Sequence, residues 1–197
     1  MEESTLHGHV VQGTPEAGLG DLEALAMEAE FRAAMTAIAA CAFAVDAFYT
    51  TIVERFGPHP DAQAWKRNRT ARHAQIAATL HYHLKIKSSA MPTVREFLSE
   101  LFRFRDLAVH PHAQFQETVY RPDIDAGVEP RFVTFSAQHA RTALGLTVEL
   151  LTSLVEKAKG IAQGDNAKWV EFAEGRADVV RAAAMSIEGL SFPDAVV

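Results

Sequence analysis

The sequence predicts an all-α protein, folded as an antiparallel bundle of four to five helices. Apolar residues recur at alternating steps of three and four through several long segments, which is the spacing of one helical face. Glycine, proline and capping residues separate these segments by short connections, as between neighbouring antiparallel helices. The composition is ordinary for a globular protein, with 48% hydrophobic and 22% charged residues among 197. A chain of this length suits one domain with a substantial core.

We expect a single helical domain over residues 21–190, because no linker divides this stretch. Residues 1–20 should form a flexible lead-in, since they have neither the basic start nor the long apolar run of a secretory signal. Residues 191–197 should form a C-terminal tail. The one cysteine, Cys41, cannot form an intramolecular disulfide, which favours a reducing, cytoplasmic location.

The first predicted helix covers residues 21–56 and contains a stretch that could be mistaken for a membrane span. Between Ala33 and Val53 only Asp46 is charged. The stretch is rich in alanine and has its carboxylate near the middle, where a bilayer would penalise it. We therefore predict a buried core helix and no membrane partner.

Two further helices should occupy the middle of the chain. The first of them is capped by Asp61 and extends to about Ile86. The next begins with a capping box formed by Thr93 and Glu96. It ends near Pro111, because proline disfavours helical geometry in the residue before it.

The region from 113 to 135 interrupts the helical pattern. Its segments ETVY and RFVTF flank RPDIDAGVEP, which suits a hairpin-like or loop insertion. A fourth helix should then run from a cap at Ser136 to Gly160. A fifth should cover about 166–189.

The charge of the chain is unevenly distributed. The whole sequence has a net charge of −6, which argues against general nucleic-acid binding. Residues 66–110, however, contain nine Lys/Arg and three Asp/Glu, whereas the remainder contains ten and 22. This basic segment could attract phosphate groups, and the alternative is a solvated helix face.

Polar residues on the apolar faces of the predicted helices are the candidates for chemistry. In the second helix, Arg72 and His83 fall near the line of Trp65, and a second arginine, Arg69, lies about 40° away. Such groups are costly to bury without partners, so we expect them to be paired or to line a cleft. Asp46, beside the core stripe of the first helix, is a candidate buried acid partner for one of the arginines. A purely structural ion pair is the alternative.

The third predicted helix ends in FRFRDLAVHP, residues 102–111. Arg105 flanks the apolar stripe, whereas Arg103 shares a face with Glu100 and should form a surface salt bridge. His110 falls at the helix end, where its imidazole can turn back towards Arg105 and the helix dipole favours its charged form. A guanidinium that holds a phosphate beside a histidine suits phosphodiester cleavage.

An arginine followed by a polar residue and, after four to six residues, by a histidine at the end of a bundle helix resembles the signature of the HEPN superfamily. Here the motif is Arg105, Asp106 and His110. The resemblance covers this motif and the bundle pattern, but not the insertion at 113–135. HEPN proteins are helical bundles that commonly dimerise, and many are metal-independent RNases that act as toxins or antiviral effectors.

The resemblance implies a role for each motif residue. Arg105 would bind the scissile phosphate, and Asp106 would orient the catalytic pair. His110 would assist proton transfer as the ribose 2′-hydroxyl attacks, leaving a cyclic phosphate. A homodimer would bring two motifs into one cleft, RNA would be the substrate, and an antitoxin or regulatory protein would be a further partner. No cofactor and no metal are implied.

Two other interpretations stay open. The chain could be a non-catalytic HEPN-like module that binds RNA or a nucleotide phosphate, or that only dimerises. It could also be an unrelated helical protein in which a buried polar network is formed by Arg72, His83, Asp46 and Arg105. His110 and His112 flank a proline and could share a metal, but no carboxylate or cysteine cluster adjoins them. The candidate substrate-binding residues are Arg69, Arg72, His83 and His112.

Overall fold

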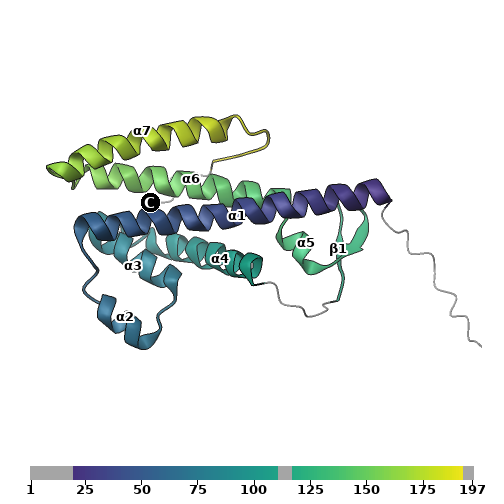
Figure 1. The fold of residues 1–197 in the computed structure, drawn as a ribbon, viewed down its shortest axis with the longest axis horizontal. Coiled ribbons are helices and arrows are strands. Elements are labelled where there is room, and N and C mark those ends of the chain that lie inside the picture. Colours follow the sequence, from purple (N-terminus) through teal and green to yellow (C-terminus); the bar gives the residue numbers. More distant parts are fainter. Residues whose placement is uncertain (1–19, 111–116, 193–197) are drawn as a thin grey trace, which may run out of the picture.

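The computed structural model describes residues 20–110 and 117–192, and in these ranges the protein is predominantly helical, as predicted (Figure 1). A small antiparallel sheet pairs β1 (Val119–Arg121) with β2 (Ala126–Val128). The helices are α1 (Asp21–Phe56), α2 (Ala62–Asn68), α3 (Arg72–Leu84), α4 (Met91–Val109), α5 (Pro130–Thr134), α6 (Ala137–Lys159) and α7 (Asp165–Met185).

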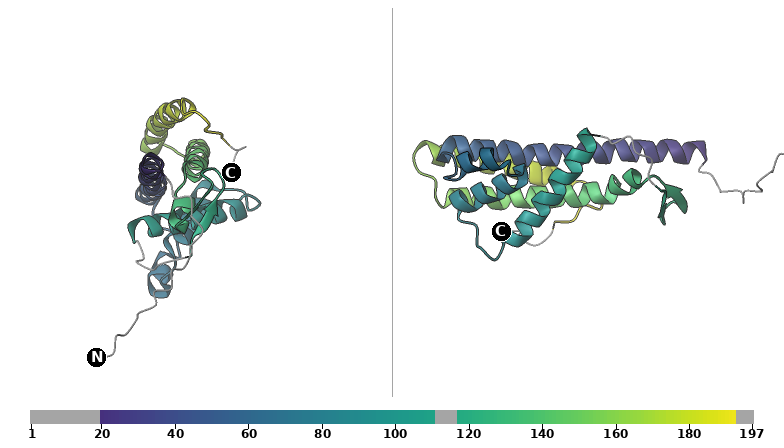
Figure 2. Two further views of the ribbon diagram at one scale, coloured as in Figure 1. Left: turned by 90° about the vertical axis from the view of Figure 1, so that its right-hand side faces the viewer. Right: turned by 90° about the horizontal axis from the view of Figure 1, so that it is seen from below.

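The long helices form three layers, seen end-on in the left view of Figure 2. α1 and α6 lie side by side in the middle layer. α7 packs against α6 on one side, and α3 and α4 pack against α1 on the other. α1 has 36 residues and therefore measures about 54 Å, which makes it the spine of the molecule.

One hydrophobic core joins these layers. Most of its fully buried side chains come from α1, α3, α4 and α6 and include Ile38, Ile76, Leu98 and Leu150. Each such side chain stabilises the fold by about 1.5–3 kcal/mol when it leaves water. The apolar stripes of α1, α3, α4 and α6 converge here, so polar groups that flank the stripes lie at the edge of the core.

Several predicted helix ends are confirmed. α1 begins at Asp21 and ends at Phe56, the predicted residues. α4 ends one residue before its C-cap, His110. Ser136 caps α6, because its hydroxyl accepts a hydrogen bond from the backbone N–H of His139.

The prediction of one continuous second helix is wrong. The chain instead forms α2 and α3, separated at residues 69–71. Arg69 adopts the left-handed conformation, with a φ of 51°. In α2, Trp65 stacks on His59 with ring centroids 4.5 Å apart, and His59 in turn contacts Tyr82 of α3. These tertiary contacts fold α2 back towards α3, which local helix propensity does not register.

The predicted capping box at the third helix does not form. α4 begins at Met91, so Thr93 and Glu96 already lie within its first turns. Pro92 occupies the first turn, where its missing N–H costs no helical hydrogen bond. The proline therefore sets the start of this helix.

The predicted hairpin is confirmed for residues 119–128, while residues 113–116 lie outside the described ranges. RFVT belongs to α5 rather than to a strand. Pro130 opens α5, and Phe132 packs on Phe31 of α1 with ring centroids 4.9 Å apart. The aromatic residues that suggested a strand instead bury a short helix against the spine.

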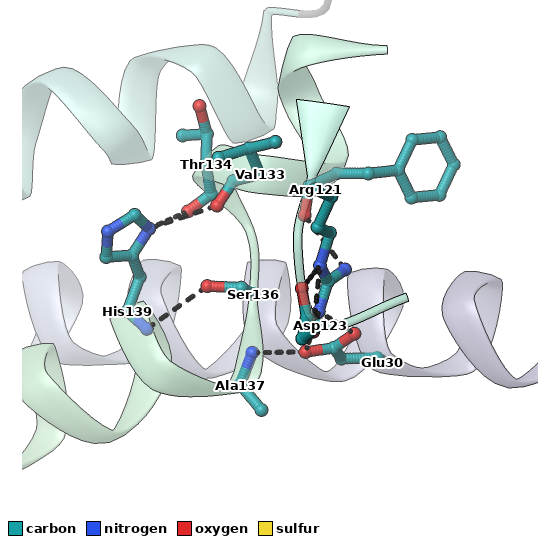
Figure 3. A network of polar contacts seen from close by, with 9 residues as sticks. Glu30, Arg121, Asp123, Val133, Thr134, Ser136, Ala137 and His139 are labelled. Carbon is teal, nitrogen blue, oxygen red and sulfur yellow. Dashed lines mark hydrogen bonds and ion pairs between the residues drawn. The ribbon is translucent and has the colours of Figure 1, made fainter. Parts of the chain in front are cut away.

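An arginine ties this hairpin to the bundle (Figure 3). The buried Arg121 donates through Nη2 to Glu30 Oε2 at 2.7 Å and to Asp123 Oδ2 at 2.9 Å. Glu30 Oε1 also accepts a hydrogen bond from the backbone N–H of Ala137 at 2.7 Å. The hairpin, α1 and the start of α6 therefore meet at one carboxylate, that of Glu30. We call Glu30, Arg121 and Asp123 the Arg121 cluster.

Among the described residues, α1 alone is long and apolar enough to cross a membrane, judged by length and composition. The structure packs it against α3, α4 and α6 and buries residues such as Ile38, Val45 and Ile52. One face of this helix therefore belongs to the protein core, as predicted. The cytoplasmic location and the absence of a membrane partner stay predictions.

Candidate functional site

A hollow of about 750 Å³ opens between the start of α3 and the second half of α4. It gathers four of the residues selected from the sequence. They supply the guanidinium groups of Arg72 and Arg105, the carboxylate of Asp106 and the imidazole of His110. We call it the Arg105 hollow. Its lining residues are Ala71, Arg72, His73, Ser99, Phe102, Arg103, Arg105, Asp106, Leu107 and His110.

Arg105 is held in place from two sides. Its Nη2 and Nε donate to Asp106 Oδ1 at 2.6 and 3.0 Å. Its guanidinium lies over the ring of the buried Phe102, 4.6 Å from the centroid. Among the hydrogen bonds of the described residues, none uses Nη1 of Arg105, so the group can donate to a ligand in the hollow.

His110 lies at the mouth of the same hollow. It is the C-cap of α4, with an extended φ of −127°, and its backbone N–H donates to the carbonyl of Asp106 at 2.9 Å. Its side chain is exposed. The helix end therefore presents an accessible imidazole one turn beyond Arg105.

Arg72 supplies a second cation from α3. Its Nε donates to Asp46 Oδ1 of α1 at 2.6 Å, and its guanidinium lies 4.3 Å from the ring centroid of Tyr49. The prediction that Asp46 pairs with an arginine of the second helix is confirmed. Arg72 also lines the Arg105 hollow, so a second arginine borders the same space.

Three predicted binding residues do not meet there. Arg69 is exposed at the end of α2 and does not line the hollow, because the break at residues 69–71 turns it away. His83, near the far end of α3, packs between Phe56 and Tyr82, and its Nε2 is buried without a hydrogen-bond partner. Burial lowers the pKa of this imidazole. His112 lies outside the described residues.

The hollow also contains two residues that sequence reasoning missed. His73 follows Arg72 in the first turn of α3, and Ser99 faces it from α4. Both are half-buried. No local signal in the sequence marks His73, because the helix break that starts α3 at Arg72 depends on tertiary contacts such as that of Trp65 with His59.

No group of three or more His, Cys, Asp or Glu side chains gathers as a metal site within residues 20–110 and 117–192. Cys41 is buried, and burial raises the pKa of its thiol. The chemistry available at the hollow is therefore that of guanidinium, imidazole, carboxylate and hydroxyl groups.

No family model matches this chain, and neither a curated protein nor a solved structure matches it. The residues of the hollow themselves indicate its chemistry. Two cations can bind an anion, an exposed imidazole can donate or accept a proton, and a carboxylate orients one of the cations.

Proposed function

We propose that the protein is a metal-independent endoribonuclease of the HEPN type. One observation carries this proposal: Arg105, Asp106 and His110 line a single open hollow, together with Arg72. An exposed imidazole beside two guanidinium groups matches the needs of RNA cleavage, in which a phosphate must be held while protons move.

The proposed reaction requires no external reactant. A base removes the proton of the ribose 2′-hydroxyl, and the 2′-oxygen attacks the phosphorus. The bond from phosphorus to the 5′-oxygen breaks as the new bond forms, and an acid protonates the leaving 5′-oxygen. The products are a 2′,3′-cyclic phosphate and a 5′-hydroxyl, with no net gain or loss of protons.

The side chains divide these tasks. His110 transfers a proton, and Arg105 binds the non-bridging phosphate oxygens, where negative charge develops. Asp106 orients Arg105 through its 2.6 Å contact, and Asp46 does the same for Arg72. Both carboxylates leave guanidinium nitrogens free to face the substrate.

One copy of the chain contributes one Arg105–His110 pair, whereas the reaction needs both an acid and a base. A homodimer that joins two hollows would supply the second imidazole from the second copy. This composite site, and a toxin-like or defence-like role under the control of an antitoxin or regulatory protein, follow from the HEPN resemblance.

Cleavage of single-stranded and structured RNA in EDTA tests the proposal. The parent protein should release products with a cyclic phosphate end, detected by mass spectrometry. Arg105→Ala and His110→Ala should each lower the rate about 100-fold or more, the usual effect of removing a transition-state donor or a proton-transfer group.

Arg32→Ala is the matched control. It removes an arginine that pairs with Glu28 on the exposed face of α1, away from the hollow. Its rate should equal that of the parent. A parent that leaves RNA intact, or cleavage that survives both hollow variants, contradicts the proposal.

The second candidate function is a non-catalytic HEPN-like module that binds RNA or a nucleotide phosphate. One observation favours it: Arg72, Arg103 and Arg105 each already pair with a carboxylate. Paired cations bind phosphate more weakly than free ones, which suits reversible binding. RNA retained without cleavage, and released by Arg105→Ala, identifies this function.

A further inference from the structure

The Arg105 hollow continues along the interface between α3 and α4. It shares His73 and Ser99 with a second hollow of about 460 Å³, which is also lined by Trp65 and Arg95. That hollow shares Arg95 with a third, of about 440 Å³. Adjoining hollows with common walls form one depression, which we call the α3–α4 groove.

The groove is long enough for more than one nucleotide. Arg95 and Arg105 lie ten residues apart on α4, which separates them by about 15 Å along the helix axis. The third hollow extends beyond Arg95 to Tyr82 and Lys85 at the end of α3. A ligand that fills the groove must therefore be extended and repeat its contacts.

Cationic side chains occur in all three hollows of the groove. Five Lys or Arg side chains line its three hollows, against three carboxylates. Three of these cations, in the Arg105 hollow, pair with acids. Lys85 and Arg95 are exposed and form no ion pair with any described residue, so both can donate to a phosphate, and Asp61 and Glu96 line the same two hollows.

Aromatic side chains line the same two hollows. Trp65 borders the second hollow, and Tyr82, which is 43% exposed, borders the third. Both rings contact His59, with centroids 4.5 and 5.0 Å away. Lys85 Nζ lies 5.1 Å from the centroid of the Tyr82 ring. The result is an aromatic wall flanked by unpaired cations.

We propose that the α3–α4 groove is an extended subsite for single-stranded RNA, in which Lys85 and Arg95 bind phosphates and Tyr82 stacks on a base. Alternating cations and aromatic faces are what a single strand needs, because its bases are unstacked and its backbone is charged. A duplex hides its base faces and gains nothing from the aromatic wall. This proposal rests on the proposed ribonuclease function.

The proposal predicts that the Michaelis constant depends on RNA length. A dinucleotide reaches only the Arg105 hollow, whereas an octanucleotide also occupies the groove. For Lys85→Gln with Arg95→Gln, KM for the octanucleotide should rise about tenfold, and the dependence of log KM on log salt should lose about 1.4 from its slope. KM for the dinucleotide, and kcat for both, should stay at the parent values.

Two variants make the result specific. Lys168→Gln with Arg176→Gln on α7 removes the same charge from residues that line none of the three hollows, and should leave both KM values unchanged. Tyr82→Leu keeps an apolar side chain without a stacking face and should raise KM for the octanucleotide about fivefold or more.

Three outcomes would contradict the proposed subsite and leave the ribonuclease proposal intact. The parent could have equal KM values for the dinucleotide and the octanucleotide, or the groove variant could behave like the α7 variant. A duplex could also inhibit cleavage of the octanucleotide as well as a single strand does. If the parent cleaves neither substrate, the ribonuclease proposal fails instead. Fluorescence polarisation of the labelled octanucleotide then decides the groove, which requires binding by the parent and loss in the groove variant.

Discussion

Two arginine–carboxylate contacts of this protein use the same chemistry in opposite surroundings. In the Arg121 cluster, the arginine side chain is 9% exposed and donates to two carboxylates and a backbone carbonyl. At the Arg105 hollow, the Arg72 side chain is 38% exposed and donates through Nε to one carboxylate, that of Asp46. Both contacts join α1 to a segment far along the chain.

The difference separates a structural cation from one that can take a ligand. All three nitrogens of Arg121 already have acceptors, so an incoming anion would have to displace Glu30 or Asp123. Arg72 keeps nitrogens that donate to no described residue and faces open space. A buried guanidinium whose nitrogens all have acceptors indicates a structural role. A guanidinium with free nitrogens beside a hollow indicates a binding role.

The largest expected effect on stability is a loss caused by disrupting the Arg121 cluster. Arg121→Met should lower the free energy of unfolding by about 3 kcal/mol, because it leaves Glu30 partly buried without its partner. Urea unfolding measures this loss. The double variant with Glu30→Met should recover part of it, since it removes the unpaired charge. A loss below about 1 kcal/mol would show that the cluster does not brace the hairpin.

A smaller effect on stability is expected at the hollow. Arg72→Met should lower the free energy of unfolding by only about 0.5–1 kcal/mol, because both partners of the pair are about one-third exposed and screened by water. The same urea titration checks it. A loss equal to that of Arg121→Met would make Arg72 a second brace and remove it from the proposed site.

The smallest expected effect is a dependence of the folding stability on pH, which comes from His83. Burial lowers the pKa of His83, and repulsion from His59 and Lys85 adds to this. The unfolded chain therefore takes up a proton before the folded one does, so stability falls as the pH drops from about 6.5 towards the folded pKa. His83→Gln should flatten this fall in urea titrations between pH 5 and 7.5, and a fall of the same size in the variant would contradict the assignment to His83.

Much of the fold follows from local pattern. The apolar steps of α1 predicted both of its ends, because the amphipathic stripe and the GPHP stop lie in neighbouring residues. The end of α4 at His110 followed from the proline after it. The partnership of Asp46 with an arginine followed from a single charge beside an apolar stripe, although the continuous helix assumed for Arg72 was wrong.

Two of the errors share one cause. The break before Arg72 and the use of RFVT as a helix depend on what each segment packs against. The early start of α4 instead follows from Pro92 in its first turn. Trp65 contacts His59, and Phe132 contacts a helix a hundred residues earlier in the chain. His73 and Ser99 joined the site only because the break placed the start of α3 beside α4.

Helical periodicity was enough to predict the class of fold and the faces that become buried, because each depends on residues within a few turns. The composition of the hollow was decided in three dimensions. The Arg72–Asp46 contact joins residues 26 positions apart, and the Arg121–Glu30 contact joins residues 91 apart. Only the folded chain brings such groups together, and their burial then determines which cation is a structural tie and which is free to bind.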